Sequence, residues 1–189
     1  MAAGDVTATL TKTRAFNCNN FDGVDDRVEI PHDNRQLGAS LLNGFTISAW
    51  IRIDTIGEGG AIATNGRILE KDSTNTGTNG FLFSVGESAN PRLTFRVNGN
   101  ASFPQSASSS LTYGVWEKVL VTMSGANPGL ANLYIDGVLS GTANQTTGTT
   151  VASITTTNVM RIGNPSTSTD RTFDGSIRDV KMWNRVLSA

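Results

Sequence analysis

The sequence predicts an all-β fold, a sandwich or jelly roll built from roughly ten or more short strands. The first indication is composition, because 24 Thr, 17 Ser, 17 Asn and 20 Gly among 189 residues suit turns and exposed strand faces better than helix interiors. The second is a period-two alternation of apolar and polar residues in successive segments. The third is the turn chemistry between these segments, in a chain without a convincing amphipathic helix.

The clearest predicted strand is 45–53, with the sequence FTISAWIRI. Its odd-numbered residues are apolar and are expected to face the core, whereas its even-numbered residues face the other way. Trp50 therefore lies on the outward phase of a strand that is otherwise apolar toward the core. The same alternation, or a short apolar run, predicts further strands at 66–71, 80–86, 92–98, 116–124, 131–137, 158–164 and 175–184.

Turn residues separate these strands. Asn98-Gly99 and Asp136-Gly137 are hairpin signals because Asn, Asp and Gly accept positive φ, and Asp136-Gly137 is the predicted tip of a tight hairpin. In the last strand, Ile177 and Val180 share a face only if a β-bulge near Arg178–Asp179 shifts the phase. Three segments rich in Thr, Ser and Gly are expected to form loops or edge strands: 55–66, 102–110 and 142–158.

Charge and hydropathy argue against two classes of function. The net charge is -1 without a run of like charges, so we expect no nucleic-acid partner, which would require a basic stripe to release counterions. No apolar stretch is long enough to span a bilayer, and the N-terminus has no apolar segment of a secretory signal. Cys18 is the only cysteine, so no internal disulfide forms and a free buried thiol is expected. A single cysteine without an internal disulfide is consistent with assembly in a reducing cytoplasm.

Seven segments follow one another along the chain: FDGVDDRVEIP, FTISAWIRI, GRILEK, LTYGVWEKVLVT, LYIDGVLSG, MRIGN and FDGSIRDVKMWNRVLSA. In this order they resemble the laminin G-like domains of the concanavalin A-like lectin/glucanase superfamily. The resemblance covers about residues 15–189 and leaves residues 1–14 as an N-terminal arm. It implies a jelly-roll sandwich of two antiparallel sheets.

The triplet Phe-Asp-Gly occurs near both ends of the chain, at 21–23 and 173–175. The resemblance implies that the first and last strands lie side by side in one sheet, which brings the two triplets near one another. In each triplet, the phenylalanine is then a core residue and the glycine allows a sharp turn into the next strand. The aspartate accepts hydrogen bonds from loop backbone N–H groups, as in an Asx turn.

A calcium site is the alternative role for these aspartates, because many relatives bind calcium at a loop edge. Calcium takes about six to eight oxygen ligands from carboxylates and backbone carbonyls. Two or three carboxylates with backbone carbonyls would be sufficient for a structural ion. A single His and a single Cys, by contrast, cannot form a zinc site. The acidic candidates at the two corners are Asp22, Asp25, Asp26, Asp174 and Asp179.

An active site is not predicted. Glycosidases of the superfamily are similar to one another in a Glu-x-Asp-x-Glu pattern, which supplies the carboxylates that flank the scissile bond. Glu70 and Asp72 begin such a pattern, but Thr74 stands where the second glutamate would be. His32 lies in a predicted turn and no nucleophile-elbow motif accompanies it. A degenerate glycosidase remains only as a third hypothesis.

Sugar-binding sites combine an aromatic platform with polar groups that hold the hydroxyls. The aromatic candidates for ligand binding are Trp50, on the outward phase of its strand, and the loop residues Phe103 and Tyr113. Trp116 and Trp183 are expected to pack in the sandwich, since Trp is largely buried in most folds. These candidates do not cluster in the sequence, so the prediction of glycan binding depends on what the resemblance to the family implies.

The predicted function is surface binding by a non-enzymatic, single-domain module. We expect it on a virion surface, as a capsid decoration or fibre protein that attaches to glycans, and the alternative is a carbohydrate-binding module of a secreted bacterial protein. The expected partners are a glycan, another virion or surface protein, or further copies of the chain. The polar arm over residues 1–14 is expected to contact such a partner.

Overall fold

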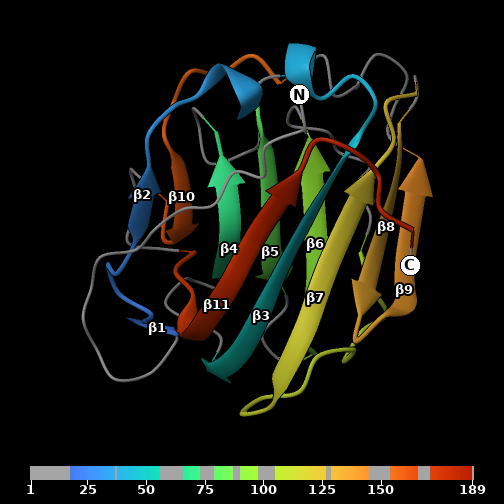
Figure 1. Ribbon diagram of the computed structural model, residues 1–189. Helices are drawn as coiled ribbons and strands as arrows, with labels where there is room; N and C mark the ends of the chain where they lie inside the picture. Colours follow the sequence, from blue (N-terminus) through green and yellow to red (C-terminus); the bar gives the residue numbers. More distant parts are fainter. Residues whose placement is uncertain are drawn as a thin grey trace.

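The computed structural model describes residues 18–36, 38–55, 66–72, 79–86, 90–97, 105–126, 129–144, 154–165 and 171–188. Within these residues, eleven strands form two antiparallel sheets that pack face to face (Figure 1). Two short 3-10 helices, η1 (Asn34–Gln36) and η2 (Gly38–Ser40), follow the first two strands. The predicted all-β, two-sheet antiparallel jelly-roll sandwich is thereby confirmed.

The six-stranded sheet lies in front in Figure 1 and the five-stranded sheet lies behind it. In spatial order, the strands of the six-stranded sheet are β1 (Asn19–Asp22), β11 (Asp174–Trp183), β3 (Phe45–Thr55), β7 (Trp116–Met123), β8 (Leu130–Ile135) and β9 (Val138–Asn144). Those of the five-stranded sheet are β2 (Val28–Ile30), β10 (Met160–Gly163), β4 (Gly66–Lys71), β5 (Phe81–Gly86) and β6 (Arg92–Val97).

The core lies between the two sheets and follows the predicted alternation. The odd-numbered residues of β3, from Phe45 to Ile53, are at most 3% exposed. The five-stranded sheet contributes Phe81, Phe83 and Phe95, and the four phenylalanine rings contact one another in pairs at centroid distances between 5.7 and 6.5 Å. Burial of each such side chain stabilises the fold by about 1.5–3 kcal/mol, so these rings hold the two sheets together.

The first and last strands are neighbours, as the resemblance implies. β1 pairs with β11 so that Phe21 stands opposite Gly175 and Asp22 opposite Asp174. Phe21 and Phe173 are both buried and meet edge to face, with centroids 6.2 Å apart. The prediction of two core phenylalanines is confirmed. Gly175, however, lies inside β11 at a register shift against β3, and not in a turn before the next strand.

The last strand contains the predicted β-bulge. The register of β11 against β3 shifts between Arg178 and Lys181, and Asp179 has a φ of 51°. This extra residue reverses the phase of the strand, so that Ile177 is buried and Val180 also packs against the core. The bulge also determines which later side chains of β11 point away from the core.

β8 and β9 form the predicted tight hairpin, with Asp136 and Gly137 at φ values of 49° and 81°. These values are those of a type I′ turn, which matches the twist of the two strands. Cys18 is half-buried, and not fully buried as predicted. Asn98-Gly99 and the predicted arm over residues 1–14 lie outside the described residues. In the part of the chain that the structure describes, no helix has the length and apolarity needed to cross a membrane.

Candidate functional site

The outer face of the six-stranded sheet carries all three tryptophans. Trp50 of β3 pairs with Arg178 and Lys118, and Trp116 of β7 pairs with Arg52, which places these side chains on the face away from the core. The three tryptophans are half-buried and none belongs to the core cluster, so the prediction that Trp116 and Trp183 pack in the core is wrong. We call this surface the tryptophan face; it comprises Arg178, Lys181, Trp183, Ser48, Trp50, Arg52, Trp116, Lys118, Leu120 and Tyr134.

A groove of about 320 Å³ opens on this face. Its floor includes Ser48, whose small side chain lies beside the larger Leu120 of the next strand. The half-buried rings of Trp183 and Tyr134 come from strands on either side of Ser48 and Leu120. Two aromatic rings and several polar groups therefore converge on one hollow, and the lining residues are Ser48, Lys118, Leu120, Tyr134, Gly137, Trp183, Leu187 and Ser188.

The chain after β11 forms one wall of the groove. It passes from the end of β11 across the front of the sheet in Figure 1. Thr46 of β3 holds this segment, because its hydroxyl donates to the carbonyl of Arg185 at 2.9 Å and accepts from the backbone N–H of Leu187 at 3.0 Å. Thr46 is fully buried although it lies on the outward phase of β3, so the wall also explains why this end of the face is covered.

Trp50, predicted as a ligand-binding residue, lies next to the groove and contacts a cation. The guanidinium carbon of Arg178 lies 5.4 Å from the centroid of Trp50 and 4.5 Å from that of Trp116. Such cation–π contacts are each worth about 0.5–2 kcal/mol and hold the arginine in place. Trp50 thus adds its own ring to the tryptophan face and also positions the guanidinium of Arg178 there.

Of the other two predicted ligand-binding residues, Tyr113 does not line the groove. Tyr113 is 38% exposed in the turn before β7, and its partial burial raises the pKa of its phenol. Gly114 fixes that turn by donating its N–H to the carbonyl of Ile53 at 2.7 Å. Phe103 lies outside the described residues. Trp183 and Tyr134 were not identified as ligand candidates from the sequence. Their outward-facing positions in the alternation of their strands could have indicated them, but the bulge in β11 changes that alternation before Trp183.

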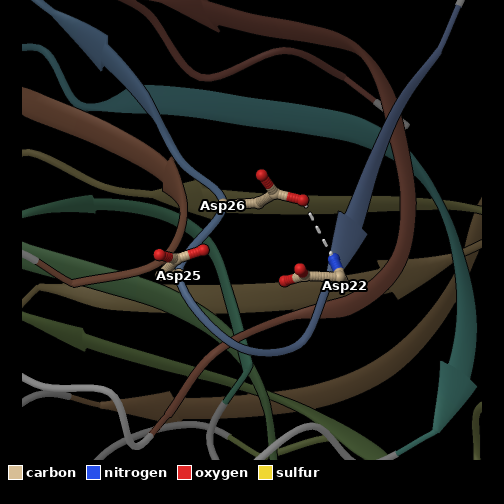
Figure 2. Close-up of side chains that lie close together, drawn as sticks. All are labelled: Asp22, Asp25 and Asp26. Atoms are coloured by element: carbon tan, nitrogen blue, oxygen red, sulfur yellow. Dashed lines mark hydrogen bonds between the residues drawn. The ribbon is translucent and has the colours of Figure 1, made fainter.

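An acidic loop joins β1 to β2, and we define it as residues 22–26. Carboxylate oxygens of Asp22, Asp25 and Asp26 lie within 4.8 Å of one another, and Figure 2 shows the three side chains around the loop. Asp22 accepts from the backbone N–H of Val24 at 2.9 Å, the predicted Asx turn. Asp26 accepts from the N–H of Asp22 at 3.2 Å, and this second bond also shapes the loop.

The acidic loop satisfies part of what calcium requires. Three carboxylates within this distance are compatible with one shell of oxygen ligands, and Asp25 and Asp22 are exposed to solvent. Asn164 donates to the carbonyl of Val24 at 3.1 Å, and its own amide oxygen is buried without a hydrogen-bond partner among the described residues. The loop therefore has an unused oxygen acceptor beside it.

Asp174 and Asp179 do not belong to this group of carboxylates. Asp174 stands opposite Asp22 in the sheet, but its carboxylate accepts a hydrogen bond from the hydroxyl of Thr55 on the other side of β11. Asp179 is exposed at the bulge in the middle of β11. The pairing of β1 with β11 thus brings the two backbones together without bringing all five aspartates to one place.

Glu70, the first residue of the incomplete glycosidase pattern, is held in a buried ion pair. It lies on the outer face of the five-stranded sheet, where Arg67 donates to its carboxylate at 3.0 Å and both side chains are at most 2% exposed. Burial raises the pKa of Glu70, and the Arg67 charge opposes this increase. On the same face Glu29 accepts from Arg161 at 3.2 Å, and this hydrogen bond lowers the pKa of Glu29. Both glutamates are thus engaged with arginines.

Several solved structures have a similar fold. A heptameric SAP-like pentraxin from Limulus polyphemus is 16% identical with a TM-score of 0.62, covering 89% of this chain and 76% of its own. The CBM40 of the Ruminococcus gnavus IT-sialidase bound to α2,3-sialyllactose is 15% identical with a TM-score of 0.58, covering 87% and 92%. Botulinum neurotoxin type C is 22% identical with a TM-score of 0.57, covering 86% of this chain and 37% of its own. At these identities the likeness concerns the fold.

Sequence comparison assigns the family. No curated protein matches the chain. A laminin G family model, Laminin_G_3, described as the concanavalin A-like lectin/glucanases superfamily, matches residues 22–189. This match spans both sheets and every strand from β2 to β11, together with the acidic loop and the tryptophan face. The chain therefore belongs to the concanavalin A-like lectin/glucanase superfamily.

Proposed function

We propose that this protein is a non-enzymatic glycan-binding module and that a sugar binds in the groove of the tryptophan face. One observation carries the proposal: the half-buried rings of Trp183 and Tyr134 line the same groove of about 320 Å³. An aromatic ring stacks against the apolar C–H face of a sugar, while polar groups bond its hydroxyls. Lys118, Ser48 and Ser188 supply such groups around the two rings.

The similar structures support this proposal. The CBM40 structure contains sialyllactose, and botulinum neurotoxin type C depends on interaction with two ganglioside molecules to enter cells. A non-catalytic role is consistent with the engagement of Glu70 by Arg67. Virion display, as a capsid decoration or fibre protein, stays a prediction from the sequence, and a module of a secreted bacterial protein is the alternative. Either one places the module at a surface or outside the cell.

We also propose that the acidic loop binds a structural calcium ion through the carboxylates of Asp22, Asp25 and Asp26. The distance between these carboxylates supports the proposal, as does the exposure of two of them. The ion would neutralise three adjacent negative charges and hold the loop between β1 and β2. Asp22 pairs with Asp174 at the start of β11, whereas Trp183 of the groove lies at the end of that strand, so this calcium would stabilise the module away from the sugar.

Replacement of the two groove aromatics tests the glycan-binding proposal. We expect Trp183→Ala and Tyr134→Ala each to weaken binding to hits from a glycan array by about 10-fold or more, because each removes a stacking surface. Binding constants from titration calorimetry, with thermal melts to verify folding, provide the measurement. Tyr113→Ala is the matched control, since Tyr113 is an exposed tyrosine away from the groove and its loss should leave affinity unchanged. A folded protein that binds no glycan, or folded groove variants with full affinity, would refute the proposal.

A further inference from the structure

The tryptophan face concentrates positive charge. Arg178, Lys181 and Lys118 lie on it in two adjacent rows of the sheet, although the whole chain has a net charge of -1. Among the residues that the structure describes, none of the three forms an ion pair within 4.0 Å. Arg52 on the same face differs, because it is paired with Asp54 at 2.9 Å. These three cations therefore have no carboxylate partner within 4.0 Å among the residues that the structure describes.

Arg178 is the most constrained of these cations. Its guanidinium lies over the rings of both Trp50 and Trp116, and its Nε atom is buried without a hydrogen-bond partner among the described residues. An indole face attracts the positive charge but does not replace the hydrogen bonds that the in-plane N–H groups make with water or an anion. The arginine is thus held in position by the two rings, while its Nε–H has no hydrogen-bond partner among the described residues.

The acidic groups near this face are committed elsewhere or lie outside ion-pair distance. Asp54 bonds Arg52 through both carboxylate oxygens. Asp136 accepts from the backbone N–H of Lys118 at 2.8 Å and caps the β8–β9 hairpin. Asp179 is exposed at the bulge next to Arg178 without a described ion pair. Among the described residues, no carboxylate therefore lies within ion-pair distance of Arg178, Lys118 or Lys181.

We infer that the tryptophan face recognises an acidic glycan, with Arg178 as the residue that binds its carboxylate or sulfate group. This inference rests on the proposed function, because the sugar ring occupies the groove. Ser48 in the groove is two residues from Trp50 along β3, and Trp50 pairs with Arg178. The backbone positions of Ser48 and Arg178 are thus separated by about 7 Å along the strand and about 5 Å across the sheet, a distance that a disaccharide spans.

The guanidinium of Arg178 is the reason to expect a preference for acidic over neutral glycans. A guanidinium binds a carboxylate or sulfate through two parallel N–H bonds, and such charge-assisted bonds are stronger than those to neutral hydroxyls. Lys118 and Lys181 flank Trp50 and Ser48 and add attraction that reaches beyond contact distance. A neutral glycan would cover the fixed cation without pairing it and would lose the bonds that the cation makes with water. The acidic member of a matched pair of glycans is therefore preferred.

A glycan array of matched pairs tests the inference, each neutral glycan being printed beside its sialylated, uronic-acid and sulfated counterparts. We expect the acidic members to bind at least 10-fold more tightly than the neutral ones, with a preference that declines as salt increases. The sialylated and uronic-acid arms report a carboxylate and the sulfated arm reports a sulfate. Arg178→Gln should weaken binding of the acidic probe by roughly 10- to 100-fold and leave the neutral probe nearly unchanged.

Two further variants separate recognition from folding. Arg178→Lys retains the charge over the tryptophans but not the planar fork, so it should restore only part of the preference. Arg52→Gln removes an arginine of the same face that is already paired with Asp54, and it should leave the preference unchanged. Equal binding of acidic and neutral probes, or a preference that survives in folded Arg178→Gln, overturns the inference while leaving glycan binding in the groove intact. Silence of every probe overturns both.

Discussion

Lys71, at the end of β4, is a fully buried lysine held by a backbone carbonyl, an amide oxygen and a histidine ring nitrogen. Its ammonium donates to the carbonyl of Asn158 at 2.6 Å and to the side-chain oxygen of Gln36 at 3.0 Å, and it contacts Nδ1 of His32 at 3.2 Å. These bonds attach η1 and the segment before β10 to the end of the sandwich. Burial lowers the pKa of Lys71 from 10.5 to about 8, because the ammonium loses the solvation it has in water.

The lowered pKa of Lys71 predicts that the protein becomes more stable as pH rises from about 8 to 10.5. In this range the unfolded chain binds a proton at Lys71 that the folded chain does not, so the free energy of unfolding increases with pH. The gap between the two pKa values corresponds to about 3 kcal/mol. Urea unfolding across this range should show a slope that Lys71→Met removes and Lys118→Met, at an exposed lysine, retains. An identical pH dependence in the wild type and Lys71→Met would contradict the assignment.

Individual tryptophans also show how a residue type misleads when it is considered alone. Trp is largely buried in most proteins, and on that basis Trp116 and Trp183 were expected in the core. Both are half-buried on the outer face of the sheet, since phenylalanine, isoleucine and valine already fill the space between the sheets. Three partly exposed indoles on one surface together indicate a binding surface, which none of them indicates when it is considered alone.

At the scale of the strand, the pairing of β11 with β3 depends on Gly175. Its φ is 138°, and a Cβ there would lie 2.1 Å from the carbonyl oxygen of Arg52. Gly137 at the tip of the β8–β9 hairpin also has a positive φ, of 81°, but a Cβ there would meet nothing within 4 Å. The two glycines therefore share a conformational requirement and differ in the space around them.

This difference predicts unequal costs of substitution. Gly175→Ala should destabilise the protein by about 3 kcal/mol or more, because the strands must separate to relieve the contact. Gly137→Ala should cost only about 1 kcal/mol, the price of a left-handed conformation at an open turn. Urea unfolding of the two variants measures both costs. Similar losses at the two positions would show that β11 and β3 adjust without strain.

The bulges of β4 and β11 each change which side chains of the strand share a face. In β4 the register shifts between Arg67 and Leu69, which places Arg67 and Glu70 on one face at a spacing that a regular strand would put on opposite faces. In β11 the shift turns Lys181 and Trp183 outward beside Ser48 and Thr46. One extra residue thus builds a buried ion pair in one sheet and part of the groove in the other.

At the scale of the whole molecule, calcium is expected to increase the thermal stability of the fold. A ligand that binds only the native state raises the melting temperature by mass action. The protein should melt at a higher temperature with calcium than with EDTA, and Asp25→Asn should remove this difference. Asp25 is the best position for the change, because the described hydrogen bonds that shape the acidic loop involve Asp22 and Asp26.

Asp179→Asn is the matched control for the calcium measurement, since Asp179 is exposed on β11 and outside the carboxylate group. This variant should keep the full calcium-dependent increase in melting temperature. The same melting temperature with calcium and with EDTA in the wild type would show that the acidic loop is held by its own hydrogen bonds. Because the loop and the groove are separate, glycan binding should persist in Asp25→Asn.

The sequence by itself determined the fold class, most strand positions and the local backbone devices. Alternation identified the inward residues of β3, the Asp136-Gly137 pair located a hairpin, and the phase break between Ile177 and Val180 required a bulge. These features are local, because side-chain direction in a strand depends on its own period and turn conformation depends on a few residues. The repeated Phe-Asp-Gly triplets, with the family resemblance, further predicted that the first and last strands pair.

Only the tertiary structure decided which outward side chains meet. Trp50, Trp116, Trp183 and Tyr134 come from four strands, and their proximity depends on the register of β3 with β7 and β11 and of β7 with β8. It also decided that Asp174 lies apart from the three carboxylates of the acidic loop. The physical reason is that a strand's sequence determines its two faces, whereas the neighbours on a face are set by pairing between segments far apart in the chain.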